Sequence, residues 1–367
     1  MGPPPVRVNR CRWNVPFGGG SCHHHSVTST AGPGRRVTII DVARRAGVSK
    51  SLASLVIRNA PGASAASREA VLLAVAELGY QPDLAAKALR EQRSRLLGVV
   101  LDPGDPFHAD LLEAIHPAAE ERGFDVVLGA RLPGRGEKRA VDSLLRSRCE
   151  GLILLGSESS ATALRQLAER VPVTLISRSG RGTGTGAVLG ADEKGAALAT
   201  DHLLGLGHRR IRFVDGGRRP GAVPRRRGYL AAMRRAGAEP DVVPGDHTEE
   251  SGIRAAQQLL GELRDGDAHP VTAVFGGNDR CATGVLDTLL RAGVDVPQRV
   301  SVVGYDDSRL ARMAHVDLTT VAQDAPELAR RAVGSLVGRV EDGTPPGPDV
   351  LLEPALVVRG TTGPPPG

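Results

Sequence analysis

The sequence predicts two folded parts: a small all-α unit near the N-terminus and a larger α/β core built on parallel sheets. From residue 96 onward, short apolar runs alternate with amphipathic helical stretches, whereas residues 37–79 show helical patterns alone. The length of 367 residues exceeds one ordinary domain. Hydrophobic residues at 41% and charged residues at 24% are typical of a globular protein.

The positive charge is concentrated at the front of the chain. Residues 1–97 carry about +9 and the remainder about −3, within a whole-chain net charge of +6. A basic front favours a polyanionic partner such as nucleic acid, although basic tails are common and often bind nothing specific. The sequence shows no apolar run near the roughly 20 residues of a membrane span and no secretory signal, so we expect a cytoplasmic protein without a membrane partner.

Residues 1–36 are rich in Gly, Pro, Ser and Arg, and we expect a disordered tail. Cys22 and the three histidines at 23–25 are potential metal ligands. Consecutive histidines in a flexible tail have no preformed geometry, and the four cysteines form no CxxC pair. We therefore predict neither a metal site nor a disulfide framework.

The segment Thr38–Arg58 has the spacing of a helix-turn-helix. Thr38 is a candidate N-cap of the first helix, Gly47 interrupts the helical pattern, and Ser49 can cap the second helix. A helix-turn-helix places the start of its second helix in the major groove of DNA. A plain helical hairpin would show the same pattern, so the spacing alone leaves both interpretations open.

A third helix and a linker complete the N-terminal part. The helix opens at Ser64 or Ser67 and ends at Gly79. An Ala-rich helical stretch and a basic linker follow. The predicted boundaries are a headpiece at 37–82 and a hinge helix with its linker at 83–95.

The core is predicted to alternate strands and helices from 96 to 360, followed by a tail at 361–367. Strands are expected at 96–101, 125–129, 151–155, 173–176, 211–214, 272–275 and 300–303. Helices are expected at 109–122, 137–148, 161–169, 193–206, 224–236, 249–262 and 279–292. Such alternation over some 250 residues predicts parallel sheets with helices on both faces, and the length fits two subdomains.

Ordered motifs extend over nearly all of this chain outside its tails. They are Val37–Ser49, Ala66–Val71, Glu77–Pro82, Leu97–Val100, Leu206–Ile211, Gly277–Asp279, Val302–Asp307, Leu318–Thr320 and Leu351–Gly360. With these motifs the chain resembles the LacI/GalR family of bacterial transcription repressors. The resemblance implies a helix-turn-helix headpiece, a hinge helix and two Rossmann-like subdomains, as in periplasmic sugar-binding proteins, with a small ligand in the cleft. It also implies that the segment after about Asp324 returns to complete both subdomains.

The resemblance assigns base readers in the second helix. Lys50 and Ser51 can donate to base edges, whereas Leu55 replaces the polar residue usual in the family and offers only apolar contact. An operator that departs from the family consensus is therefore expected.

Further DNA contacts are implied outside that helix. Thr38, Ser49 and Asn59 are candidates for phosphate contacts. In the hinge, Leu89 matches a leucine that wedges into the minor groove, with Ala86 beside it. A packing role in an ordinary linker helix is the alternative for Leu89.

The resemblance also assigns eight residues to the effector. They are Asp102, Phe107, Ser177, Arg225, His247, Asn278, Asp306 and Gln323. Several follow predicted strands, and open α/β sheets bind ligands at the carboxyl ends of strands. Arg, Asp and Asn side chains bind sugar hydroxyls by charge-assisted hydrogen bonds. Taken singly each is more often a surface or capping residue; Arg225 could belong to a solvated run at 225–227.

His247 departs from the family pattern, because the lac repressor has a tryptophan there that stacks on the sugar. The smaller imidazole argues against a lac-type galactoside. A sugar remains favoured over a purine as the effector.

The combined prediction is a repressor that binds a near-palindromic operator as a homodimer and needs no cofactor. A dimer is expected because the family's C-terminal tetramer helix has no match after Arg359. A solute-binding protein for sugar uptake would need a signal peptide and no basic headpiece. An enzyme is not expected: no GxGxxG follows the first strand, no P-loop or nucleophile–base pair stands out, and the glycine-rich stretch 180–186 lies in a predicted loop.

Overall fold

The computed structural model describes residues 37–80, 93–265 and 270–367. The chain divides into an N-terminal unit that ends at Asp83 and a core that begins at Leu84. The predicted tail at 1–36 and the hinge residues Ala86 and Leu89 lie outside the described residues. Among the helices that are described, none is long and apolar enough to cross a membrane.

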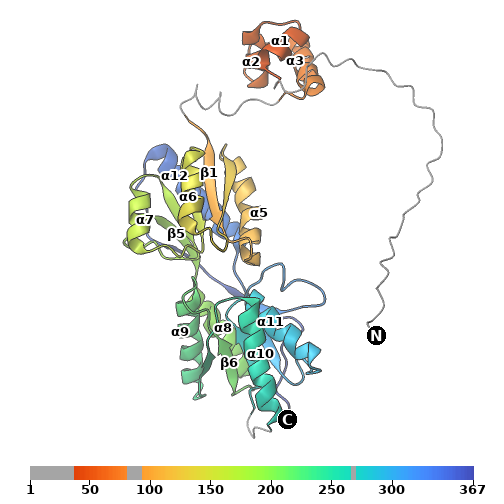
Figure 1. The fold of residues 1–367 in the computed structure, drawn as a ribbon, viewed down its shortest axis with the longest axis vertical. Coiled ribbons are helices and arrows are strands. Elements are labelled where there is room, and N and C mark those ends of the chain that lie inside the picture. Colours follow the sequence, from red (N-terminus) through yellow and green to blue (C-terminus); the bar gives the residue numbers. More distant parts are fainter. Residues whose placement is uncertain (1–36, 81–92, 266–269) are drawn as a thin grey trace, which may run out of the picture. The chain divides into compact units, whose positions relative to one another are not determined.

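The described part of the N-terminal unit, residues 37–80, is a bundle of three helices, as predicted (Figure 1). They are α1 (Ile39–Arg45), α2 (Lys50–Ile57) and α3 (Ala65–Leu78). The core of the bundle is made by small and branched apolar side chains, namely Val42, Ala43, Ala53, Val56, Val71 and Ala74.

The caps of these helices follow the sequence signals. Thr38 caps α1, and its backbone N–H donates to Asp41 Oδ2 at 2.9 Å. Ser49 Oγ accepts from the N–H of Leu52 at the start of α2. The C-cap of α3 is Gly79 in the left-handed conformation, at φ 59°. Local capping therefore fixes the start of α1, the start of α2 and the end of α3.

The first half of the core is a parallel sheet of six strands in the order β11-β5-β4-β3-β1-β2. The strands are β1 (Leu96–Leu101), β2 (Asp125–Ala130), β3 (Gly151–Leu155), β4 (Val173–Ile176), β5 (Gly186–Gly190) and β11 (Val350–Leu352). Helices α5 (Pro106–Glu120) and α12 (Ala325–Asp342) pack on one face around Leu111, Ile115 and Leu336. Helices α6 (Glu137–Arg146) and α7 (Ala161–Ala168) pack on the other.

The second half repeats this plan in the order β12-β10-β9-β8-β6-β7. Its strands are β6 (Ile211–Val214), β7 (Asp241–Val243), β8 (Ala273–Gly276), β9 (Ser301–Asp306), β10 (Thr319–Ala322) and β12 (Ala355–Val357). One face is covered by α8 (Asp192–Gly205) and α9 (Ala222–Arg235), the other by α10 (Glu249–Arg264) and α11 (Asp279–Arg291). The pairing of β10 with β12 is antiparallel.

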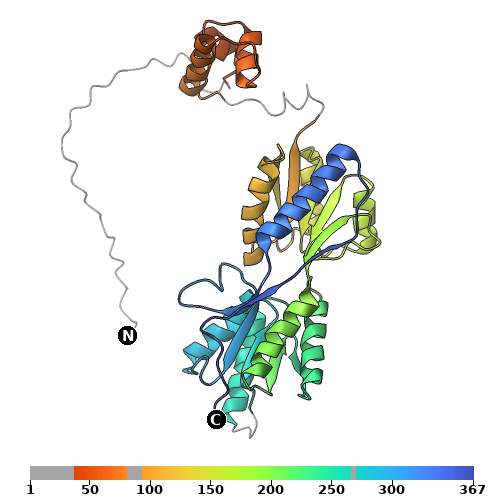
Figure 2. The same ribbon diagram turned by 180° about the vertical axis from the view of Figure 1, so that it is seen from behind.

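Three crossovers join the halves, after β5, after β10 and between β11 and β12 (Figures 1 and 2). The chain after Asp324 adds α12 and β11 to the first sheet and β12 to the second, as the resemblance implied. Two α/β subdomains on parallel sheets, with helices on both faces, confirm the predicted fold class.

Seven strands and seven helices of the core were predicted from local patterns, and each has a counterpart in the structure. The patterns missed α12 and the strands β5, β7, β10, β11 and β12. Of the missed strands, β7, β11 and β12 have three residues each, too few to show a hydrophobic period.

The expected C-terminal tail is bonded to the sheet up to Gly363. Thr361 is 4% exposed, and its hydroxyl donates to the carbonyl oxygen of Val302 at 2.7 Å. The N–H of Gly363 donates to Ser301 Oγ. Residues 361–363 therefore belong structurally to the core.

Candidate functional site

Two sites are built on separate units of the chain: the exposed start of α2 in the headpiece and a cleft in the core. In the headpiece, Lys50 and Ser51 are the first two residues of α2, and both are exposed. The helix begins at Ser49, whose hydroxyl is used as the cap. The amino end of α2 therefore presents polar donors to solvent, as a recognition helix requires.

The other predicted DNA contacts of the headpiece have intramolecular neighbours. Leu55 is half-buried, and a Cβ built on Gly62 would lie 3.6 Å from its Cδ1. Asn59 adopts a positive φ of 52°, and its Oδ1 accepts from Arg68 at 2.8 Å. Thr38 Oγ1 donates to Asp41 at 2.7 Å. If Leu55, Asn59 and Thr38 contact DNA as predicted, they do so while keeping these contacts within the headpiece or by exchanging them for contacts with DNA.

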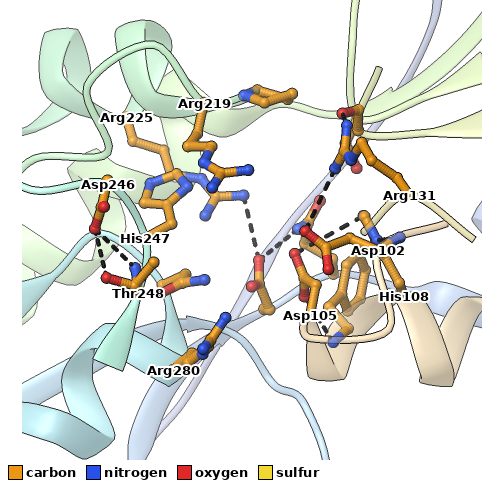
Figure 3. Close-up of a pocket in the computed structure, with 17 residues that line it drawn as sticks. Asp102, Asp105, His108, Arg131, Arg219, Arg225, Asp246, His247, Thr248 and Arg280 are labelled. Carbon is orange, nitrogen blue, oxygen red and sulfur yellow. Dashed lines mark hydrogen bonds and ion pairs between the residues drawn. The ribbon is translucent and has the colours of Figure 1, made fainter. Parts of the chain in front are cut away.

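The core cleft is lined by residues from both subdomains (Figure 3). All eight predicted effector residues line it, although they span more than two hundred positions of the sequence. The sequence analysis did not assign Asp105, Arg131, Gly156, Arg219, Pro220, Asp246, Thr248 and Arg280 to the site. Asp102 follows β1, Ser177 follows β4 and Asp306 ends β9, so the carboxyl ends of both sheets face one cleft.

Arg225 makes more side-chain hydrogen bonds than the other arginines that line the cleft. It is 4% exposed, which excludes the solvated charge run as its environment. Its guanidinium donates to Asp192 Oδ1 at 2.9 Å, to the carbonyl oxygen of Gly277 at 2.8 Å and to Asp306 Oδ1 at 3.2 Å. The guanidinium carbon lies 3.7 Å from the centre of the Tyr305 ring.

The charge state of Arg225 follows from these contacts. Burial lowers its pKa, but the neighbouring Asp192 and Asp306 outweigh burial, and the pKa is raised. Arg225 is therefore a fixed positive charge at the floor of the cleft.

Asp306 connects Arg225 to the crossover after β10. Its Oδ1 also accepts from Gln323 Nε2 at 2.8 Å. Its backbone has a positive φ of 114°, an uncommon conformation for a residue with a side chain. Burial raises the pKa of this carboxyl well above its ordinary range in spite of the attraction of Arg225. A hydroxyl donor from a ligand would stabilise the ionised form.

Asp279, behind Asp306, is fully enclosed. Burial raises its pKa to about 7, although its oxygens accept from Thr320 Oγ1 at 2.5 Å and from the N–H of Ser308 at 2.6 Å. The charge of Asp279 raises the pKa of Asp306, and the charge of Asp307 raises the pKa of Asp279. Two carboxyls that share one buried region resist simultaneous ionisation.

Arg131 forms a second ionic centre at the first-sheet wall of the cleft. Its guanidinium lies 3.7 Å from Asp102 Oδ2 and 3.6 Å from both Glu137 Oε2 and Glu158 Oε1. Arg219, from the second subdomain, reaches the same Glu158 Oε1 at 2.7 Å. Glu158 therefore joins the two subdomains across the cleft.

His247 lies between β7 and α10, and its ring packs against Gly216 and Gly277, where a Cβ would overlap it. Burial lowers the pKa of His247 well below its ordinary value, and Arg225 and Arg219 add to this effect, so the ring is neutral. Its Nε2 is buried without a partner in the described chain. Both His247, at φ 61°, and Ser177, at φ 64°, have positive φ values.

The residues that sequence reasoning missed lie in loops after strands or, for Arg280, in the first turn of the helix that follows a strand. Arg131 follows β2 directly, and Arg219 and Arg280 each follow a strand of the second sheet by a few residues. A rule that assigns every polar residue just after a strand to the ligand edge would have found them. Over the described residues no group of His, Cys, Asp or Glu is placed to hold a metal ion.

The lining residues are suited to binding a ligand through many polar contacts rather than to acting together on one reacting atom. Apart from Gly156, only Phe107 and Pro220 among the lining residues are apolar. Paired Arg and Asp groups can donate to and accept from several hydroxyls at once. The cleft therefore fits a compact polyhydroxylated ligand.

Comparison with known proteins agrees with this architecture. Residues 38–83 match the bacterial regulatory proteins of the lacI family, and residues 200–362 match a periplasmic binding protein-like domain. The chain is 34% identical to the ribose operon repressor of Escherichia coli K12 over 88% of this chain and 99% of that protein. It is 33% identical to the HTH-type transcriptional regulator GalR of the same strain, over 88% and 94%.

Solved structures give the same result. A LacI transcriptional regulator from a Rhodococcus species is 49% identical, with a TM-score of 0.69 over 73% of this chain and 98% of that one. The lac repressor dimer bound to operator and an anti-inducer is 31% identical, with a TM-score of 0.74 over 90% and 100%. The chain belongs to the LacI family of bacterial regulatory proteins.

Proposed function

We propose that the chain represses transcription by binding a near-palindromic operator as a homodimer, under the control of a small sugar-like effector in the core cleft. The observation that carries this proposal is that the eight residues assigned by the resemblance gather in one cleft, on a chain that also bears a helix-turn-helix. Relatives of more than 30% identity are named as a ribose operon repressor and as the regulator GalR. Repression in the cytoplasm, without catalysis, is the activity we assign.

The proposed mechanism is a two-state equilibrium of the core. The subdomains meet at the cleft and at three crossovers. A ligand that contacts both walls of the cleft therefore shifts the equilibrium between two relative arrangements of the subdomains. The effector shifts operator affinity only by its differential affinity for the two states. Lys50 and Ser51 are proposed to read bases, with Leu55 as an apolar contact. Thr38, Ser49 and Asn59 are proposed to position the headpiece on phosphates, and Leu89 with Ala86 to act in the minor groove.

A sugar is favoured over a purine by the polarity of the cleft. Phe107 is the one aromatic carbocycle among the lining residues, so an extended flat base would find little stacking surface. A relative of 31% identity was solved as a CelR–cellobiose complex. The HTH-type transcriptional repressor PurR of Erwinia tasmaniensis is 32% identical, and we keep a purine as the second candidate class of effector.

The test uses the purified full chain, operator fragments from upstream of its own gene and a thermal-shift screen of sugars and purines. For the identified effector, Asp306→Asn should lower affinity about tenfold to hundredfold, because a charged hydrogen bond contributes about 1.5–3 kcal/mol. Operator affinity without effector should be unchanged. Asp306→Asn is preferred to Arg225→Ala, since removing Arg225 leaves Asp192 and Asp306 buried without their cation.

The matched control is Asp201→Asn, on an exposed face of α8 where the carboxylate pairs with Arg235. This control substitution should change neither the affinity for the effector nor the affinity for the operator. Effector affinity that is equal in Asp306→Asn and in the unmodified chain would refute the cleft as the effector site. Absence of any preferred operator sequence would refute the repressor function.

A further inference from the structure

Arg280 differs from the other arginines of the cleft in having no acidic partner. Arg131, Arg219 and Arg225 each form ion pairs with carboxylates. Within the part of the chain that the structure describes, Arg280 is half-buried and has neither a hydrogen bond nor an ion pair. An unpaired, partly desolvated charge is costly for the folded state, so its retention indicates a partner that arrives from outside.

Arg280 also stands in an unfavourable place for a cation. It is the second residue of α11, directly after the N-cap Asn278 and Asp279. The amino end of a helix carries a partial positive charge, which favours an anion and disfavours a guanidinium. The adjacent Asp279 does not compensate, because its oxygens are bound to Thr320 and Ser308.

The guanidinium is directed into the cleft and reaches the facing wall (Figure 3). A Cβ built on Gly104, in the loop after β1, would lie 3.5 Å from Arg280 Nη1. Asp102 on that loop already accepts from the N–H of Gly104 and lies 3.7 Å from Arg131. The side chain thus spans the cleft from one subdomain to the other without being neutralised there.

Two further polar groups near this position lack partners in the described chain. Asn278 uses its Oδ1 to cap α11 at the N–H of Cys281, which leaves its amide NH2 unbonded. His247 Nε2 is buried and unpaired, and both residues line the same cleft. The neutral imidazole adds no charge, so Arg280 is the unpaired charge of this group.

The cleft as a whole is not positive, since Asp102, Asp105, Asp246 and Asp306 also line it. These carboxylates suit hydroxyl donors, whereas Arg280 suits an acceptor with negative charge. We propose that the effector is a polyhydroxylated molecule with one anionic substituent, a phosphate or a carboxylate, and that Arg280 binds this substituent across the cleft. This inference rests on the proposed effector function of the cleft.

The first experiment uses inorganic phosphate as the probe, at constant ionic strength maintained with chloride. Thermal unfolding is followed for the full chain, for Arg280→Gln and for the control Arg291→Gln. Arg291 lies on the same helix, but its side chain is 78% exposed and pairs with Asp287. Phosphate should raise the unfolding midpoint of the unmodified chain and of the control more than that of Arg280→Gln. No stabilisation, or equal stabilisation of all three, overturns the inference.

The second experiment identifies the source of the anion by titration calorimetry with matched pairs. The pairs are ribose with ribose 5-phosphate, glucose with glucose 6-phosphate and galactose with galacturonate. The charged member of one pair should bind at least about tenfold more tightly than its neutral parent, as a charged hydrogen bond implies, and Arg280→Gln should abolish that preference. Preference for a phosphate ester assigns a phosphate, and preference for galacturonate assigns a carboxylate.

The outcomes separate this inference from the function on which it rests. One outcome would contradict the anionic substituent alone. Neutral sugars would bind as tightly as charged ones, their affinity would not depend on Arg280, and it would fall in Asp306→Asn. The effector site would then still be supported. Operator binding and circular dichroism of Arg280→Gln, compared with Arg291→Gln, exclude misfolding as the cause of a lost preference.

Discussion

At the residue scale, Arg225 shows that a buried charge has a structural and a binding role at once. It is held by Asp192, by the carbonyl oxygen of Gly277 and by Asp306, and it stacks on Tyr305. These contacts orient the guanidinium before any ligand arrives. A ligand then meets a preorganised cation, which lowers the entropic cost of binding.

Lys50 provides the prediction for DNA recognition. Lys50→Ala should weaken operator binding by about 1–3 kcal/mol and relax the preference at one base pair, because an exposed ammonium at the start of α2 can donate to a guanine edge. Fluorescence anisotropy with operator variants measures both effects. Lys138→Ala is the matched control, an exposed lysine of α6 in the core, and should leave binding unchanged. A uniform loss over all sequences would instead indicate a phosphate contact.

Asp279 predicts a pH dependence of stability. Burial raises its pKa in the folded state to about 7, above the ordinary 3.8, so the folded chain holds the proton more tightly than the unfolded chain does. Its contribution to stability is present below about pH 4 and is lost as the pH rises through about 7. Asp279→Asn mimics the neutral form and should therefore reduce the decline in unfolding free energy over this interval.

Urea unfolding at pH 5 and at pH 7.5 measures this decline in both proteins. The unfolding free energy of Asp279→Asn should still decline somewhat between these pH values, because the pKa of Asp306 is also raised in the folded state. An identical decline in both proteins would show that Asp279 is ionised throughout the interval.

At the element scale, the approach of α8 to α9 depends on a glycine. A Cβ built on Gly228 of α9 would overlap the carbonyl oxygen of Glu193 and lie 3.0 Å from Ala196 Cβ, both on α8. Gly228→Ala should therefore destabilise the core by about 1–3 kcal/mol or more. Gly205→Ala is the control: the glycine lies in α8, and no atom stands within 4 Å of the built Cβ.

The control substitution should leave stability unchanged or raise it by up to about 1 kcal/mol, since alanine favours a helix over glycine. Denaturant unfolding of both variants gives the comparison. Equal stability of the two would mean that α8 and α9 can move apart without cost.

Most elements were predictable from local signals. The strands β1 and β3 are continuous apolar runs, and α7 and α10 begin at Ser160 and Thr248, whose hydroxyls cap them. The short strands β7, β11 and β12 exist because a neighbouring strand supplies their hydrogen bonds. Their formation is a property of the sheet, which a local pattern does not contain.

At the scale of the whole molecule, ion pairs connect the subdomains on two flanks. Glu158 pairs with Arg219 at 2.7 Å on the flank of α7 and α9 (Figure 1). On the flank of α5, Asp110 pairs with Arg309 at 3.0 Å and with Arg312 at 3.2 Å. These contacts favour the present closure of the cleft.

Asp110→Asn should loosen this closure. The arginine partners are 43% and 51% exposed, so the loss is about 1 kcal/mol, or roughly fivefold in the ratio of closed to open core. Small-angle scattering should report a larger core, and added salt should enlarge the unmodified core in the same direction. Asp142→Asn, which breaks an exposed pair within α6, is the control. Unchanged scattering would show that the crossovers alone hold the halves.

The class of the protein was predictable from the sequence alone, through the capped helices of the headpiece, the strand–helix alternation of the core and the motifs of its family. Through the resemblance of these motifs to the family, it also named eight residues that line the cleft. Which charges are paired could not be predicted in this way, because it depends on the folded arrangement of the chain. Asp192, Glu158 and Gly104 lie far from Arg225, Arg219 and Arg280 along the chain, and the crossovers bring them together. Pairing depends on distances of a few ångströms between loops, and such distances arise from packing of whole elements rather than from local pattern.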